Sequence, residues 1–146
     1  MAEGETTALR IRAYRDEDFA QVRDLWKACK LTMPYNDPAA DIAFCRNSGH
    51  GEVFVGEDEA GAVVATVMAG HDGHRGWIYY VAVAPERQGT GLGRQMMRHA
   101  EAWLHSLGVP KVQLLIRESN RAVREFYARL GYEQSPTLVM QRWLKA

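Results

Sequence analysis

The chain has 146 residues, and its 18 Lys and Arg are balanced by 18 Asp and Glu, which gives a formal net charge of zero. This length suits one domain spanning residues 1–146, and 47% hydrophobic with 25% charged residues is typical of a globular protein rather than a disordered one. A balanced charge argues against a nucleic-acid coat, and no apolar run approaches the roughly 18 residues of a membrane span. We therefore expect neither nucleic acid nor membrane as a partner.

The N-terminal third predicts one strand and two helices. The first residues are polar and lack the apolar segment of a secretory signal. Apolar residues then recur at helical spacing after Asp16, which is a residue type that caps helices. The predicted elements are a loose terminus over 1–7, a strand over 8–13, a helix from Asp16 to Cys29, a loop over 31–37 and a helix over 38–47.

The middle of the chain predicts an antiparallel meander. Its apolar runs are rich in aromatic and β-branched residues, which favour strands, and short polar links with glycine separate them. The predicted strands cover 52–57, 62–69 and 77–84, with turns over 58–61 and 71–76.

The second half changes to alternating strands and helices. Five apolar residues spaced three or four apart indicate a long helix that ends at Gly108, followed by a strand over 111–118 and a helix over 120–130 closed by Gly131. Strand, helix and strand over 77–117 form a βαβ unit, whose two strands should be parallel neighbours. The expected fold class is α/β (α+β), with a mixed, mostly antiparallel sheet flanked by helices. The five spaced residues are Leu92, Met96, Ala100, Trp103 and Leu107.

A glycine-rich turn, Gln88-Gly-Thr-Gly-Leu-Gly-Arg94, separates the third meander strand from the long helix. Glycines let the backbone approach a ligand closely, and the start of the helix offers unpaired N–H groups, so the turn predicts a phosphate site. It is not a P-loop, because Arg94 stands where that motif needs Lys. It also does not match the G-x-G-x-x-G fingerprint of dinucleotide-binding domains, because Arg94 stands where that fingerprint has its third glycine. Gln113 stands where the fingerprint has an acidic residue.

Three segments together resemble the GNAT family of acyl-CoA N-acyltransferases. Gln88 to Gly93 is similar to the family's pyrophosphate-binding Q-x-x-G-x-G signature, Val81 to Pro85 is similar to its pantetheine-pairing strand, and Asn120 to Tyr132 is similar to its closing motif. Within the family, the chain most resembles the bacterial YpeA-like subgroup. The resemblance implies that the βαβ unit forms a CoA cleft.

The activity implied by the resemblance is direct transfer of an acetyl group from acetyl-CoA to a primary amine. The acceptor would be a small molecule, a protein N-terminus or a lysine, and no metal is implied. One alternative is an acyl-CoA-binding regulatory module with weak or no turnover. Another is a small nucleotide-binding or structural α/β domain that shares only the glycine turn. By family position, the residues that bind the co-substrate are Val81, Ala82, Val83, Gln88, Gly89, Thr90, Gly91, Leu92, Gly93, Arg94 and Asn120.

Tyr127 is the candidate catalytic residue, because the matching family tyrosine protonates the departing CoA thiolate. Asn120 and Tyr127 are seven residues apart, about two helical turns, and so share one face of their helix. Transfer from a phenol of pKa ~10 to a thiolate whose thiol has pKa ~8.5 is uphill by about 2 kcal/mol. We therefore expect Tyr127 to act chiefly as a hydrogen-bond donor to the sulfur.

The sequence leaves the general base open. Many family members carry a glutamate on the strand before the glycine turn, but residues 77–84 contain no acid. His71 and His74 lack a third ligand at metal-binding spacing. The candidate bases are His71, Asp72, His74, Tyr79, Tyr80, Glu118 and a water chain.

The acceptor pocket and the oligomeric state are the least determined features. By resemblance, the first helix and the loop over 31–37 shape the acceptor pocket, with Met33, Tyr35 and Asn36 as candidate lining residues. An exposed Trp77 or Trp143 would favour a homodimer, although strand aromatics often pack in cores.

Two further features concern the compartment and the charge. Cys29 and Cys45 are too few for a disulfide scaffold, which favours the cytoplasm. Residues 1–84 carry 8 basic and 13 acidic side chains, whereas residues 85–131 carry 8 basic and 4 acidic ones. The basic excess coincides with the predicted CoA segment. The arginines that could meet phosphates are Arg87, Arg94, Arg117, Arg121 and Arg124.

Overall fold

A computed structural model describes residues 9–145. The predicted terminus over 1–7 and the first residue of the predicted strand over 8–13 lie outside the described residues. The chain divides into two compact units, Met1–Leu115 and Ile116–Ala146.

The first unit is built on a five-stranded mixed sheet whose spatial order follows the chain order. The first four strands pair antiparallel, which confirms the predicted meander, and the last pair is parallel, which confirms the predicted βαβ unit. The strands are β1 (Arg10–Ala13), β2 (Gly51–Glu57), β3 (Val63–His71), β4 (Gly76–Val83) and β5 (Val112–Leu114).

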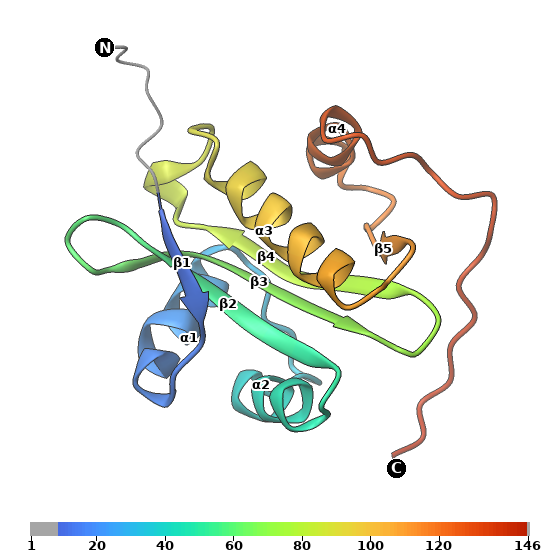
Figure 1. Cartoon of the computed structure of the whole chain (residues 1–146), viewed down its shortest axis with the longest axis horizontal. Helices are drawn as coiled ribbons and strands as arrows, with labels where there is room; N and C mark the ends of the chain where they lie inside the picture. The colour runs from blue at the N-terminus through green and yellow to red at the C-terminus, as the bar shows by residue number, and fades with distance from the viewer. Residues whose placement is uncertain (1–8, 146) are drawn as a thin grey trace. The chain divides into compact units, whose positions relative to one another are not determined.

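Helices cover both faces of this sheet (Figure 1). On one face, Val22, Trp26 and Ile42 pack with buried strand residues such as Val53 and Val55 into one apolar cluster. On the other face, the long helix α3 lies against β3 and β4. The helices of this unit are α1 (Phe19–Ala28) after the short 3-10 helix η1 (Asp16–Asp18), α2 (Pro38–Asn47), and α3 (Leu92–Ser106) after η2 (Pro85–Arg87).

The second unit contains one helix, α4 (Arg121–Arg129), among its described residues. Asn120 caps it, because the Asn120 side chain accepts a hydrogen bond from Val123 N at 3.2 Å. The helix ends at Leu130, and Gly131 follows with φ 98°, a left-handed conformation that favours glycine. The prediction of a helix closed by Gly131 is confirmed.

Two predictions about the ends of elements are wrong. Asp16 does not cap α1: it begins η1, and Asp18 instead accepts a hydrogen bond from Arg15 N at 2.8 Å while pairing with Arg12. The predicted strand over 111–118 ends at Leu114, because only three residue pairs join β5 to β4.

The buried face of α3 differs from the row of five spaced apolar residues. Leu107, one of those five, is 50% exposed, whereas Met97 and Leu104 are buried. The helix packs against two neighbouring strands, β3 and β4. Because this apolar contact is wide, residues that are adjacent in the helix, such as Met96 and Met97, are both buried.

Candidate active site

The glycine turn lies between β4 and α3, as the sequence predicts (Figure 1). Gly89 and Gly91 have φ values of 81° and 90°, so both occupy the left-handed region that other residues avoid. Gly91 is the N-cap of α3, and no side chain there accepts a hydrogen bond from the helix. Among residues 9–145, therefore, no side chain caps the first N–H groups of α3, which lie at the positive end of the helix dipole. This arrangement suits a phosphate.

Among the described residues of the first unit, the edge of β4 beyond Ile78 is not covered by another strand. The parallel pairing with β5 ends at Ile78 and Leu114, while β4 continues to Val83. Ala84 N donates to Val64 O of β3 at 2.9 Å. Because the N–H and C=O groups of successive strand residues point to opposite edges, those of Val83 point away from β3, to the open edge of β4. The short helix η2 joins the end of β4 to the glycine turn.

Two side chains lie at the carbonyl of Val83 on this edge. The Cys29 thiol donates to Val83 O at 3.2 Å, and the Gln88 amide donates to the same oxygen at 3.1 Å. Burial raises the pKa of the Cys29 thiol, so the thiol keeps its proton and acts as a donor here. The predicted co-substrate residue Gln88 therefore touches the predicted pantetheine strand within the same unit.

Next along β4, Tyr80 interrupts the regular strand. Its φ is 53°, and Tyr80 and Val81 together lie opposite the single β3 residue Val67. A side chain at Gly76 would lie 3.0 Å from Leu104 of α3, so an uninterrupted strand would also turn Tyr80 toward α3. The bulge instead places Tyr80 on the α1–α2 face, at a backbone cost of about 1–2 kcal/mol.

A hydrogen-bonded network holds Tyr80 in this conformation. Its ring stacks on Trp26 of α1 at 3.7 Å between centroids and 8° between planes. The buried hydroxyl of Thr66 accepts from the Trp26 indole at 2.8 Å and donates to Tyr80 O at 2.9 Å. The Tyr80 hydroxyl donates to Asp41 Oδ2 of α2 at 2.7 Å. Both elements that cover this face thus hold one strained tyrosine.

In the second unit, Tyr127 is buried, with its ring 4.9 Å from that of Phe126 and 5.7 Å from that of Tyr132. Burial raises the pKa of Tyr127 to about 12. The phenol therefore stays protonated throughout the neutral range and is suited to donating a hydrogen bond. Asn120, the other predicted site residue on this helix, uses its side-chain oxygen as the cap of α4.

The structure weakens several of the candidate bases. Asp72 accepts from His74 N at 2.9 Å, from Arg75 N at 2.7 Å and from the Trp77 indole at 3.1 Å. These bonds, led by the one from Arg75, lower the pKa of Asp72 to about 2, so this carboxylate stabilises the β3–β4 turn.

The remaining base candidates are tyrosines, histidines and a glutamate. Burial raises the pKa of Tyr79 and of Tyr80, which disfavours both as phenolate bases. His71 accepts from Gly73 N at 3.2 Å in the β3–β4 turn, and His74 is exposed there. Glu118 lies in the second unit. No group of three or more His, Cys, Asp or Glu that could hold a metal ion occurs among residues 9–145.

The predicted phosphate-binding arginines fall into three groups. Arg87 pairs with Asp58 at 2.9 Å, so it supports the β2–β3 turn. Arg94 is exposed in the first turn of α3, next to the uncapped amides. Arg117, Arg121 and Arg124 belong to the second unit.

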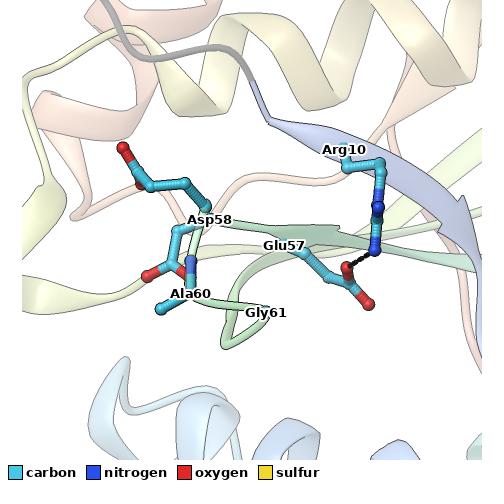
Figure 2. A pocket seen from close by; sticks show the side chains of 6 residues that line it. Arg10, Glu57, Asp58, Ala60 and Gly61 are labelled. Atoms are coloured by element: carbon cyan, nitrogen blue, oxygen red, sulfur yellow. Dashed lines mark hydrogen bonds and ion pairs between the residues drawn. The ribbon is translucent and has the colours of Figure 1, made fainter.

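A pocket of about 300 Å³ lies at the β2–β3 turn and not at the glycine turn (Figure 2). Figure 2 shows Arg10 and Glu57 joined across it, at 2.8 Å. Arg12 also binds Glu57, at 2.7 Å, which lowers the pKa of that carboxyl. Of the charged groups that line this pocket, Arg10 and Glu57 pair with each other, and Asp58 pairs with Arg87. We place the candidate site at the β4 edge and glycine turn, where, among the described residues, β4 has no second strand partner beyond Ile78 and no side chain caps α3.

The sequence did not indicate Asp41, the stacking of Tyr80 on Trp26 or the contact of Cys29 with the β4 edge. Asp41 and Tyr80 are 39 residues apart, and neither stands in a motif. The only local signal is Asp41 itself, an acidic residue inside a short helix.

Among the candidate dimer residues, Trp143 is 62% exposed and Trp77 is half-buried. No helix among the described residues is both long and apolar enough to cross a membrane.

Comparison with known proteins shows the family of this chain. The model of the acetyltransferase (GNAT) family matches residues 19–132. A protein of Agrobacterium tumefaciens strain C58 assigned as an acetyltransferase has 26% identity and a TM-score of 0.76, covering 92% of this chain and 99% of its own.

Two more distant structures share the fold. AAC(6')-Iy, solved with the bisubstrate analog CoA-S-monomethyl-acetylneamine, has 16% identity and a TM-score of 0.78 over 92% of this chain and 97% of its own. Glucosamine-6-phosphate N-acetyltransferase from Arabidopsis thaliana has 20% identity and a TM-score of 0.71 over 94% and 99%. Because the family model covers well over half of the sequence, the chain belongs to the GNAT family of acetyltransferases and is an acyltransferase enzyme.

Proposed function

We propose that this protein transfers the acetyl group of acetyl-CoA directly to a primary amine of a small molecule, a protein N-terminus or a lysine. One observation carries the proposal: the open edge of β4 is followed, after the short helix η2, by a left-handed glycine turn at the N-terminus of α3, which has no side-chain cap among the described residues. The turn would bind the pyrophosphate, and the backbone of residues 81–83 would pair with the pantetheine arm. Arg94 would add a charged hydrogen bond to phosphate.

The reaction forms a bond between the amine nitrogen and the acetyl carbon and breaks the carbon–sulfur bond of the thioester. The amine must lose a proton, and the thiolate that leaves must be stabilised. With the pKa of Tyr127 at about 12, full proton transfer to the thiolate of a thiol with pKa near 8.5 is uphill by about 5 kcal/mol. We propose that Tyr127 donates a hydrogen bond to the sulfur and that solvent supplies the proton.

The broader assignments are also proposals. Residues 19–132 span both compact units, which supports a single catalytic domain. Membership of the YpeA-like subgroup is proposed from the resemblance of the sequence as a whole. Cys29 and Cys45 are both free thiols, which supports a cytoplasmic location, where thiols stay reduced. Two of the compared structures, AAC(6')-Iy and glucosamine-6-phosphate N-acetyltransferase, bind or are named for amino sugars, and this supports a small-molecule amine as the first acceptor class to test.

The test is a thiol-release assay with acetyl-CoA and a panel of amines: a polyamine, an aminoglycoside, glucosamine 6-phosphate, a lysine peptide and a peptide with a free N-terminus. The proposal expects CoA release that depends on one panel amine, together with a product heavier by one acetyl group. Tight acetyl-CoA binding with no turnover of any amine would favour a regulatory binding module instead. Equal binding of ATP and acetyl-CoA would contradict the proposed co-substrate.

A further inference from the structure

Asp41 differs from the other acidic side chains that are not fully exposed. In residues 9–145, every other such carboxylate pairs with an arginine. No such ion pair includes Asp41, whose carboxylate accepts one hydrogen bond, from Tyr80. A carboxylate has about four lone-pair sites, so most of the accepting capacity of Asp41 is unused. The five pairs are Asp18–Arg12, Glu57–Arg12, Glu52–Arg46, Asp58–Arg87 and Glu101–Arg98.

The position of Asp41 relates it to the reacting end of the proposed co-substrate. The open edge of β4 comprises residues 79–83, a length of roughly 16 Å at about 3.3 Å per residue. A co-substrate whose phosphates lie at the glycine turn and whose arm follows this edge has its thioester near Tyr79 and Tyr80. Asp41 lies one tyrosine side chain away from that point, 2.7 Å from the Tyr80 hydroxyl.

The strained conformation of Tyr80 serves this placement. Without the left-handed φ of 53°, the Tyr80 side chain would point to the α3 face, away from α2. Stacking on Trp26 fixes the ring, and the ring carries the hydroxyl that holds Asp41. Backbone strain that persists only because the surroundings impose it is typical of functional positions. Tyr80 therefore acts as a positioning residue for the carboxylate.

We propose that Asp41 determines acceptor specificity by binding an amine that is cationic in neutral water. The inference rests on the proposed transfer function and narrows its acceptor class. Aliphatic amines, with a pKa near ~10.4 when lysine-like, are cationic at pH 7, whereas aromatic amines are neutral there. A half-buried carboxylate without a cationic partner attracts the former and gives the latter no ionic contact. The surplus of acidic side chains in residues 1–84 favours the same class.

Calorimetric titration of the CoA-saturated protein tests this assignment, with spermidine, kanamycin and a lysine peptide amide as cationic probes and aniline as the neutral one. Wild type should bind at least one cationic probe and prefer it to aniline. Asp41→Asn should weaken that probe about tenfold or more. Asp41→Glu should retain part of the preference, and Tyr80→Phe, which keeps the stacked ring, should weaken the probe about threefold.

Asp24→Asn is the matched control, because it removes the same charge from the exposed face of α1, where Asp24 pairs only with its neighbour Arg23. It should bind every probe as wild type does. The acetyl-CoA affinity of each variant reports on folding and on the proposed function. Unchanged binding of the cationic probe by Asp41→Asn, with acetyl-CoA affinity intact, overturns this inference alone. The inference about Asp41 is also overturned if no cationic probe binds wild type. If wild type does not bind acetyl-CoA, the proposed function is overturned instead.

Discussion

Replacing Gly89 with alanine separates the conformational role of the glycine turn from its proposed ligand-binding role. Gly89 has φ 81°, and a Cβ at this position would have no atom within 4 Å. The substitution therefore causes no clash, and its cost is that of a left-handed alanine, about 1–2 kcal/mol. For a chain of this size we expect a melting temperature lower by about 3–6 °C.

Gly108→Ala is the matched control for this experiment. Gly108 has φ 86°, again with nothing within 4 Å of the added Cβ, and it lies just beyond the opposite end of α3. Both variants should lose similar stability in thermal melts followed by circular dichroism. Only Gly89→Ala should weaken the binding of acetyl-CoA, by roughly 10-fold or more in calorimetry. The reason is that the added methyl group prevents about one charge-assisted hydrogen bond to the phosphate. Equal acetyl-CoA affinity for the two variants would refute the argument that the turn binds phosphate.

Three further outcomes follow from the structure. Tyr127→Phe should lower kcat about tenfold or more while the KM for acetyl-CoA changes little, and a kcat of this variant equal to that of wild type would contradict the proposed role. Because the pKa of Tyr127 is about 12, wild-type kcat should show no alkaline loss from this group below pH 10. Thr66→Val leaves the Tyr80 carbonyl and the Trp26 indole without their partner, so the free energy of unfolding should fall by about 2–4 kcal/mol in urea titration, and Thr66→Ser should recover most of it. The hydrogen bond from Arg12 lowers the pKa of Asp18 below its usual value. The stabilisation that the Asp18 carboxylate contributes is therefore complete above about pH 4 and is lost as the pH falls through the folded-state pKa. In Asp18→Asn the free energy of unfolding should fall less steeply with acid than in wild type, and an unchanged acid dependence would contradict this.

Much of the fold could be predicted because the signals are local. Glycines at the ends of helices and between strands, together with alternating or helical spacing of apolar residues, predicted the meander, the parallel βαβ unit and the capped α4. The glycine turn was predicted for the same reason, since left-handed backbone at Gly89 and Gly91 requires that residue type.

Features that depend on distant contacts could not be predicted. The end of β5 at Leu114 is set by where β4 stops pairing with it, although the alternation in the sequence continues to Ile116. The strained backbone of Tyr80 depends on Trp26 and Thr66, from two other elements. Asp41 stands out only when the arginine partners of the other carboxylates are known, and pairing across the fold leaves no trace in local spacing.

We propose that acetyl-CoA binds along the β4 edge with its phosphates at the glycine turn. A titration of wild-type protein with acetyl-CoA, followed by two-dimensional amide NMR, tests this binding mode. The largest shifts should occur at the amides of Val81 and Val83 and of Gly89, Gly91 and Gly93. Shifts confined to the charged pocket around Asp58 and Gly61, or none at saturating acetyl-CoA, would contradict it.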